Sequence, residues 1–406
     1  MITLHYVAQP RGVRDCFITG WTWLSLQPLP TLEAIFYMLL ANPNLLFPAF
    51  LLAGLLMGWL LHRSDFCISG ILRDVFMFRD YTQLPPLLLV VAAGMLLFQL
   101  ARMAGILPFD PPPTYGSEVS LLALGGGLLF GIGMVLAGGC VVGTLYKLGS
   151  GNLTSLLAFL GMLVGSMIYA EIYPAVAELR QATVLTDRPT LVQAWPEGGL
   201  LAGWGLVALA AIPLVLWWRQ GRITINSPAA GFIQPWRVAL ILVALNLLIY
   251  LLAGWPFSIS TAYTKIAAFL ELLVAPGHVA QLAYFQQDSR VIETTGGRLT
   301  GGPGPRIDLI FISEIPLLLG IMLGALASAL ALKEFHLGPW PPRRQGMAAF
   351  AGGALVLLGA RLAGGCNLKF ILGGLPLLSF QAMLFAAGLV AGAWLGALLL
   401  PRIILR

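Results

Sequence analysis

Charged side chains are scarce in this sequence. Asp, Glu, Lys and Arg make up 10% of its 406 residues, whereas hydrophobic residues make up 58%. A water-soluble domain carries roughly 25% charged residues, because its surface has to be solvated by water. The shortage therefore excludes a soluble globular protein and indicates that lipid is the main solvent. The formal net charge is +6, but no basic stripe carries interleaved aromatic residues, so we expect Lys and Arg at a membrane surface and no nucleic-acid partner.

Cysteine is also rare, and the common cofactor and nucleotide motifs are missing. The four cysteines are too few for a disulfide scaffold, and none belongs to a Cys-x-x-Cys pair, so a zinc or iron–sulfur site has no support from spacing. We expect no metal and no other cofactor. A Gly-x-x-x-x-Gly-Lys-Ser/Thr loop is absent, which argues against an ATP-driven pump. The first residues lack a charged n-region leading directly into a short apolar stretch, so no cleaved signal peptide is predicted.

Long apolar runs are what the sequence has in abundance. Their lengths of about 17–23 residues suit a helix that crosses a hydrocarbon core about 30 Å thick. Strict alternation of polar and apolar residues is not found, which argues against a transmembrane barrel. The sequence therefore predicts an all-α membrane protein with about nine transmembrane helices. We place these helices at 45–61, 85–105, 120–138, 152–172, 199–218, 237–254, 313–333, 347–364 and 378–400.

Four further segments are too short to cross a bilayer alone, namely 65–78, 140–149, 258–274 and 366–374. Irregular backbone at membrane depth is tolerated only where protein or a water-filled cavity satisfies its polar groups. We therefore predict four re-entrant half-helices. The polar stretches 173–198 and 275–312 are expected outside, and the apolar segment 31–41 is expected to be an interfacial or packed helix.

An internal repeat connects the two halves of the chain. Residues 136–140 (Leu-Ala-Gly-Gly-Cys) recur at 362–366, and two upstream glycine positions match as well. These upstream matches are Gly126 with Gly352 and Gly133 with Gly359. We predict an N-terminal extension over 1–44, a first repeat over 45–218, a linker over 219–236, and a second repeat over 237–406 that carries the insert 275–312.

A weaker match lies further upstream. Gly54 and Gly58, in the helix before Cys67, echo Gly320 and Gly324, in the helix before Lys333. In this alignment Lys333 stands where the first half has Cys67, so the symmetry is broken there.

The positive-inside rule orients the two halves. The short loops that carry most Arg and Lys are all placed in the cytoplasm if the N-terminus is outside, although Arg11, Arg14 and Arg102 then lie on the outer side. Helices 152–172 and 378–400 run in opposite directions in this arrangement, so the repeats are predicted to be inverted. Inverted repeats are typical of transporters, with the substrate path at the repeat interface.

The two turns Gly138-Gly139-Cys140 and Gly364-Gly365-Cys366 are the main candidates for chemistry. Glycines allow a helix to end sharply, and the free N–H groups of a following half-helix favour an anion. Each cysteine would lie at that helix start, where the dipole lowers a thiol pKa. The alternative is that the glycines only permit close packing and that the cysteines are small buried apolar residues.

Other residues could assist at these turns. Arg361 within a predicted span is a functional candidate, which could bind an anion or hold a carbonyl or a carboxylate such as Glu171 or Glu271. Lys147 and Lys369 follow the turns, where they could attract an anion or snorkel to an interface. No role is assigned to Cys16.

Three motifs together resemble the YeeE/YedE family of sulfur-compound membrane transporters, over roughly residues 45–400. They are Arg63-Ser64-Asp65-Phe66-Cys67-Ile68-Ser69-Gly70 with Arg73-Asp74, the stretch 136–143 around Cys140, and the stretch 359–368 around Cys366, which includes Asn367. The resemblance implies uptake of thiosulfate or a similar small sulfur anion across the bacterial inner membrane. It further implies an hourglass-shaped path lined by Cys67, Cys140 and Cys366, in which thiol hydrogen bonds pass the anion along.

The resemblance also implies partners and alternatives. Members often work with a TusA-like cytoplasmic sulfur carrier, and longer members with such an insert include a YedE-type branch linked to selenium metabolism. We therefore expect a multi-pass inner-membrane transporter surrounded by lipid, not an enzyme. A selenium-compound transporter, a membrane sulfurtransferase that passes sulfane sulfur to a carrier, and a structural subunit with purely packing cysteines stay open as alternatives.

Overall fold

Nine helices in the described part of the chain are long and apolar enough to cross a membrane, which confirms the predicted number. The computed structural model describes residues 43–404 apart from 108, 113–114, 116–117, 226, 228, 230, 289 and 295–296. Most of the predicted extension, with Cys16 and segment 31–41, lies outside the described residues. Seven of the nine stretches are single helices, namely α4 (Leu84–Met103), α7 (Leu153–Ala182), α9 (Gly199–Arg219), α10 (Pro235–Ala253), α14 (Leu309–Ala331), α15 (Arg343–Ala363) and α16 (Phe380–Ile404). The other two, Asn44–Phe78 and Leu122–Gly149, each join a longer helix to the short one that follows it, and the longer helices are α2 (Pro43–Ser64) and α5 (Leu122–Leu136).

Short helices occupy the four segments that are too short to cross. They are α3 (Ile68–Phe78), α6 (Val141–Gly149), α11 (Ser260–Val274) and the π-helical segment η2 (Leu368–Gly374). Cys67 precedes α3, and Cys140 precedes α6. The depth of these helices in a membrane stays a prediction.

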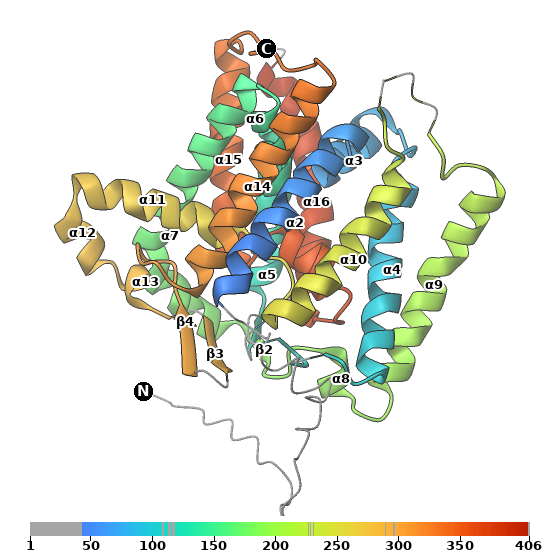
Figure 1. Cartoon of the computed structure of the whole chain (residues 1–406). Helices are drawn as coiled ribbons and strands as arrows, with labels where there is room; N and C mark the ends of the chain where they lie inside the picture. Colours follow the sequence, from blue (N-terminus) through green and yellow to red (C-terminus); the bar gives the residue numbers. More distant parts are fainter. Residues whose placement is uncertain are drawn as a thin grey trace, which may run out of the picture.

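The remaining elements gather at one end of the helix bundle (Figure 1). This strand end holds α8 (Leu191–Ala194) and two antiparallel strand pairs, β1 (Val119–Ser120) with β2 (Val184–Thr186) and β3 (Arg290–Thr294) with β4 (Gly297–Gly301). In the 275–312 insert, α12 (Pro276–Gln281) and α13 (Ala283–Gln286) precede β3. The buried Lys265 holds this insert, because its Nζ lies 2.8 Å from Asp308 Oδ2 and 2.9 Å from the Gly304 carbonyl oxygen.

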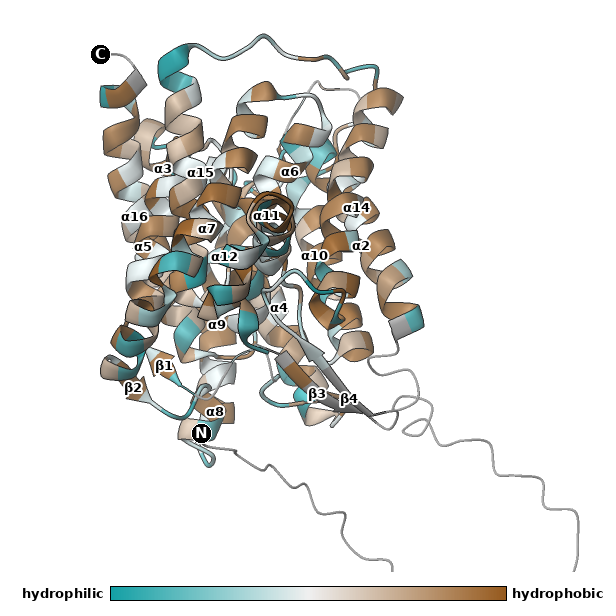
Figure 2. Ribbon diagram, turned by 90° about the vertical axis from the view of Figure 1, so that its left-hand side faces the viewer, coloured by the Kyte–Doolittle hydropathy of each residue, from teal (hydrophilic) through white to brown (hydrophobic). Residues whose placement is uncertain are grey.

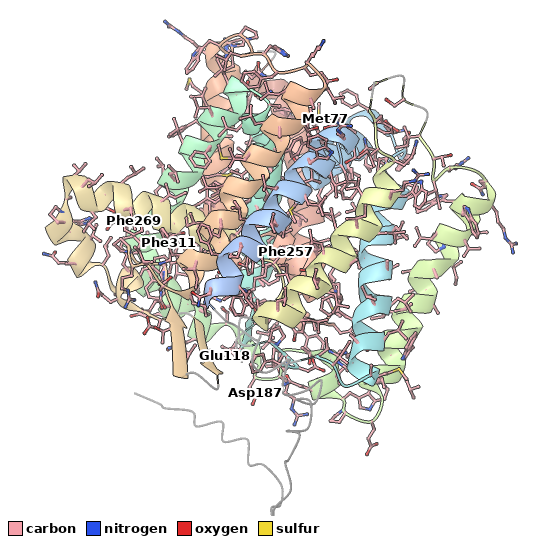
Figure 3. The ribbon with its side chains drawn as sticks, viewed as in Figure 1. Met77, Glu118, Asp187, Phe257, Phe269 and Phe311 are labelled. Atoms are coloured by element: carbon pink, nitrogen blue, oxygen red, sulfur yellow. The ribbon has the colours of Figure 1, made fainter. Side chains whose placement is uncertain are left out.

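The opposite end, called the C-terminal end, is where α2, α9, α14 and α16 finish (Figure 1). The loops predicted to be cytoplasmic therefore share one side of the bundle. Figure 2 shows hydrophobic residues concentrated in the middle of the bundle and hydrophilic residues towards both ends. Figure 3 places Met77 near the C-terminal end and Glu118 and Asp187 near the strand end. This distribution is that of a multi-pass membrane protein.

Helix packing is reciprocal between the two halves. The helix α2 packs against α14, and α4 packs against α10; likewise α5 packs against α16, and α7 packs against α15. If α2 is exchanged with α10, α4 with α14, α5 with α15 and α7 with α16, the same set of contacts results. The exchange also relates the α3–α16 contact to the α11–α7 contact.

The helices α5 and α15 cross at the centre through four glycines. A Cβ on Gly126 would lie 2.6 Å from the Gly359 carbonyl oxygen, and a Cβ on Gly133 would lie 2.6 Å from that of Gly352. Distances this short leave no room for a side chain, so the two backbones are in direct contact. The same glycines are the ones that match in the sequence repeat.

The weaker upstream match coincides with a helix contact, and it does not fit the reciprocal packing described above. Gly54 and Gly58 pack directly on α14, where a Cβ on Gly54 would lie 2.5 Å from the Leu317 carbonyl oxygen. The helices α2 and α14 run in the same direction (Figure 1), so an inversion cannot exchange them. Reciprocal packing instead relates α3 to α11, and the counterpart of Cys67 is then Ile259, which precedes α11, and not Lys333.

Candidate functional site

Each Gly-Gly-Cys turn joins a long helix to a short one. The helix α5 ends at Leu136 and Gly138 follows with φ +69°, while α15 ends at Ala363 and Gly364 follows with φ +81°. A residue with a Cβ is strained in this left-handed region, so glycine lets each helix stop abruptly. The positive φ expected for the turns is thus found at the first glycine of each.

The second glycine of each turn is required by space. A Cβ on Gly139 would lie 3.1 Å from the backbone nitrogen of Thr144, and one on Gly365 would lie 2.5 Å from the Cδ of Lys369. Both turns therefore fold their backbone against the residues that follow. This brings each cysteine to the start of the next short helix.

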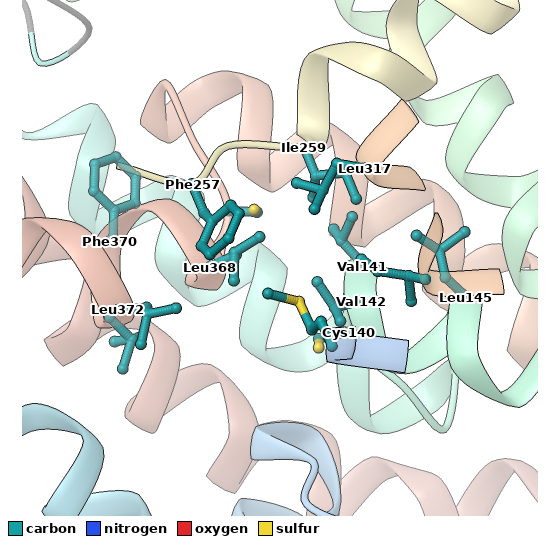
Figure 4. Packing of buried hydrophobic residues seen from close by; sticks show 14 of the residues in the cluster. Cys140, Val141, Val142, Leu145, Phe257, Ile259, Leu317, Leu368, Phe370 and Leu372 are labelled. Carbon is teal, nitrogen blue, oxygen red and sulfur yellow. The ribbon is translucent and has the colours of Figure 1, made fainter. Parts of the chain in front are cut away.

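Two of the three candidate cysteines share a cavity of about 60 Å³ between α2, α3, α6, α10 and η2. Cys67, Cys140 and Asn367 line it, together with mostly apolar side chains. Figure 4 shows Cys140 at the start of α6 with Val141, Val142 and Leu368 around it. A space of this size can hold a few water molecules or a small anion.

The side chains of Cys67 and Cys140 lie next to each other. The sulfur of Cys140 accepts a hydrogen bond from the backbone nitrogen of Gly143 at 3.3 Å, as a helix cap. Gly143 leaves room for both thiols, because a Cβ there would lie 2.8 Å from Cys67 Sγ and 3.4 Å from Cys140 Sγ. Gly143 was not among the predicted site residues, although its place three residues after Cys140 is where a capping amide is expected.

Asn367 and Cys366 complete the second turn. The Asn367 side chain lies beside Cys140, and its Oδ1 is buried with no hydrogen-bond partner among the described residues. Cys366 is fully buried and lies beside the backbone amides of Leu368 and Lys369. It is not among the side chains that line the cavity, so Asn367 is the contact between this turn and the Cys67–Cys140 pair.

Arg361 is buried, and the partners of its guanidinium are hydroxyl groups. Its guanidinium donates to the hydroxyls of Ser260, Thr261 and Tyr284, at 3.2 Å for Thr261 and 3.3 Å for Tyr284. Its Nε has no partner among the described residues. Glu314 accepts from the backbone nitrogen of Thr261 at 2.9 Å, so this carboxylate caps the start of α11.

Of the alternatives for Arg361, the one in which it holds Glu171 or Glu271 is wrong. Both carboxylates lie beside His278 instead, at 3.2 Å from Nε2 for Glu171 and 2.5 Å from Nδ1 for Glu271. The three hydroxyl partners of Arg361 were not predicted from the sequence. Ser260 and Thr261 could have been found as polar residues at the start of a short apolar segment, whereas Tyr284 in the insert gave no signal.

The two lysines after the turns bend back towards them. Lys147 Nζ donates to the Gly138 carbonyl oxygen at 2.7 Å, and Lys369 Nζ donates to the Gly364 carbonyl oxygen at 2.8 Å. Lys369 is 8% exposed and lies 5.0 Å from the ring centroid of Tyr115, so it does not snorkel to an interface. Each ammonium group is therefore hydrogen-bonded to the first glycine of a Gly-Gly-Cys turn.

Comparison with known proteins gives a consistent group of relatives. A family model described as sulphur transport matches residues 63–395. A protein of Spirochaeta thermophila named thiosulfate transporter TsuA is 28% identical over 373 residues, which covers 87% of this chain and 98% of that protein. A protein of Escherichia coli with the same name is 25% identical and covers 85% of this chain and 92% of that protein. A probable transporter YedE of Escherichia coli is 28% identical over 42% of this chain and 40% of that protein.

Proposed function

Because this chain belongs to the sulphur transport family, we propose that it is an inner-membrane transporter that takes up thiosulfate or a related small sulfur-containing anion. The proposed path is lined by Cys67, Cys140 and Cys366. The observation that carries the proposal is the meeting of the Cys67–Cys140 thiol pair with Asn367 of the other turn in one buried cavity.

The arrangement of the helices supports a path between two inverted repeats, 45–218 and 237–406. Their packing is reciprocal, and α5 and α15 cross in opposite directions at matched glycines. Transporters of this kind bind substrate at the repeat interface. With the arginine-rich loops in the cytoplasm, Cys366 faces the outer half of the path and Cys67 faces the inner half. A hollow of about 360 Å³ at the C-terminal end, bordered by Arg63 and Asp65, provides a cytoplasmic exit.

The chemistry of the turns suits a small anion that must enter and leave. The starts of α6 and η2 direct backbone N–H groups and the positive ends of helix dipoles towards the cysteines. Thiols add weak, polarisable donors. Several fixed cations in direct contact would hold an anion too tightly, whereas conduction requires sites that the ion can leave. A thiosulfate-like ion therefore passes from Cys366 to Cys140 and then to Cys67.

Substrate choice follows the relatives with the widest coverage. The two proteins named thiosulfate transporter match 87% and 85% of this chain, whereas the YedE protein matches 42%. This supports thiosulfate over a selenium compound. A TusA-like carrier that docks at the cytoplasmic hollow is the partner we propose for the anion after release.

Uptake by purified protein in liposomes tests the proposal. We expect Cys67→Ala, Cys140→Ala and Cys366→Ala to abolish uptake of thiosulfate labelled on both sulfurs, while Cys16→Ala, outside the proposed path, retains it. Arrival of intact doubly labelled thiosulfate without a carrier supports transport. A persulfide trapped on one of the three cysteines would instead favour the sulfurtransferase alternative, and normal uptake by all three variants would reject the path.

A further inference from the structure

We infer that Lys147 and Lys369 are positioning residues of the anion path, each neutralising the carbonyl end of the helix that stops at a Gly-Gly-Cys turn. The inference rests on the proposed function and extends it to residues outside the cysteine set. It explains how an anion can pass between two helix ends that would otherwise repel it.

The repulsion arises from the helices that precede the turns. The last carbonyls of an α-helix have no partner within the helix, and together they act as roughly half a negative charge. Both α5 and α15 point this negative end at a turn, with Cys140 and Cys366 only two residues beyond Gly138 and Gly364. An anion held by either cysteine would therefore lie close to uncompensated carbonyl oxygens.

At each turn a lysine ammonium group lies next to these negative carbonyl oxygens. The two ammonium groups donate to carbonyl oxygens that are equivalent in the repeat, those of Gly138 and Gly364, at 2.7 and 2.8 Å. A cation at the carbonyl end of a helix is favourable, and more so where it is partly buried. Lys147 is half-buried and Lys369 is buried, so water does little to screen either charge.

The lysines do not come from equivalent positions, which argues against simple inheritance from a repeated sequence. When the two turns are aligned on their cysteines, Lys147 corresponds to Gly373 and Lys369 corresponds to Gly143. Neither glycine could be a lysine. A Cβ on Gly143 would lie 2.8 Å from Cys67 Sγ, and a Cβ on Gly373 would lie 2.8 Å from the Tyr115 hydroxyl oxygen. The lysine of each half therefore reaches the equivalent carbonyl oxygen from a different position in the sequence.

The surroundings of Lys369 are shaped to hold it in place. Gly365 provides the space for the side chain, because a Cβ there would lie 2.5 Å from Lys369 Cδ. The Tyr115 hydroxyl donates to the Lys369 carbonyl oxygen at 2.6 Å and so fixes the backbone from which the side chain starts. In this turn the ammonium group of Lys369 is directed at the Gly364 carbonyl oxygen.

The end of α15 carries more positive charge than the end of α5. Arg180 Nη2 donates to the Leu362 carbonyl oxygen at 2.8 Å and Gln381 Nε2 donates to that of Ala363 at 2.7 Å, next to the Lys369 contact. At the end of α5, the additional donor is the neutral hydroxyl of Ser69, at 2.7 Å from the Met134 carbonyl oxygen. The turn with Cys366 is therefore the more attractive one for an anion that enters.

The test measures thiosulfate uptake by liposomes that contain the wild type, Lys147→Met, Lys369→Met, Lys147→Arg or the control Lys333→Met. Lys333 is exposed at the end of α14, away from both turns. We expect each of the two methionine variants at the turns to raise the KM for thiosulfate roughly ten-fold, because a cation at a partly buried helix end contributes on this scale. Lys147→Arg keeps the charge and should stay within about three-fold of the wild type, and Lys333→Met should not change the KM.

Two results would overturn the inference. One is a KM within about two-fold of the wild type in both methionine variants while Cys140→Ala still abolishes uptake. The other is a loss in Lys147→Arg as large as in Lys147→Met, since shape and not charge would then matter. If Lys369→Met fails to fold, the half-buried Lys147 variants decide alone. Absence of thiosulfate uptake by the wild type, in contrast, rejects the proposed function itself.

Discussion

Gly143 faces the thiol of Cys67 so closely that a Cβ on this glycine would lie 2.8 Å from the sulfur. The glycine stands in α6, whereas Cys67 precedes α3, so the contact joins two short helices that are far apart in the chain. A missing side chain thus makes the room in which Cys67 and Cys140 meet. The neighbouring positions can test this arrangement.

Gly143→Ala should separate the two thiols and reduce thiosulfate uptake strongly, with a loss of stability of about 1–3 kcal/mol from overpacking. Gly70→Ala is the matched control in α3. A Cβ on Gly70 would lie 3.8 Å from Cys67 Cβ, an ordinary contact, so this change should keep uptake and leave stability equal or slightly higher. Uptake and thermal unfolding of both variants check the prediction, and equal uptake by the two would contradict it.

The glycine crossing of α5 and α15 makes a separate prediction about stability. Gly359→Ala would place a Cβ 2.5 Å from the Gly126 carbonyl oxygen, so the helices must move apart, at a cost of about 1–3 kcal/mol. Gly125→Ala, next to Gly126, has no atom within 4 Å of the new Cβ and should not destabilise the fold. Thermal unfolding in detergent distinguishes them. A shared unfolding temperature would show that the crossing is looser than described.

His278 gives the segment α12 a pH dependence. Its hydrogen bond to Glu271, with a smaller contribution from Glu171, raises the pKa of the imidazole above its usual value of 6.5. The folded pKa is the higher one, so the contact stabilises α12 at low pH and is lost as the pH rises through that raised pKa.

Hydrogen exchange of α12 and α13 should therefore accelerate between about pH 6 and about pH 9, beyond the intrinsic pH effect. Glu271→Gln should weaken this dependence. Glu178→Gln, a change in α7 at a carboxylate that does not pair with His278, should preserve it. If Glu271→Gln exchanges like the wild type at both pH values, the ion pair does not hold the segment.

Hydropathy predicts the long helices well because each one has to match the thickness of a bilayer. The ends are less predictable. Helix α7 continues to Ala182, beyond the predicted end at residue 172, since the polar residues that follow the apolar run, such as Glu178 and Arg180, are good helix formers. Composition marks where the lipid contact ends, not where the helix ends.

The site was only partly predictable. The turn glycines and their cysteines could be found because each needs a particular residue type at a fixed spacing. The meeting of Cys67 with Cys140 and the hydroxyls around Arg361 could not, because they depend on how distant helices pack. The match of Gly54 with Gly320 suggested a sequence repeat for a related reason. Glycines that allow two helices to touch have the same spacing as glycines inherited by duplication.

The crossing of α5 and α15 has the form of a contact between two copies of one subunit. Gly126 contacts Gly359, which is the repeat counterpart of Gly133. Gly133 in turn contacts Gly352, which is the counterpart of Gly126, so the two contacts are reciprocal, as in a two-fold symmetric dimer. In a dimer of identical subunits, any substitution changes both contacts and both substrate sites together. In one continuous chain each side can change alone. The two turns are thereby free to hold the same ion with unequal affinity, and a pore built on a symmetric frame can acquire a preferred entrance.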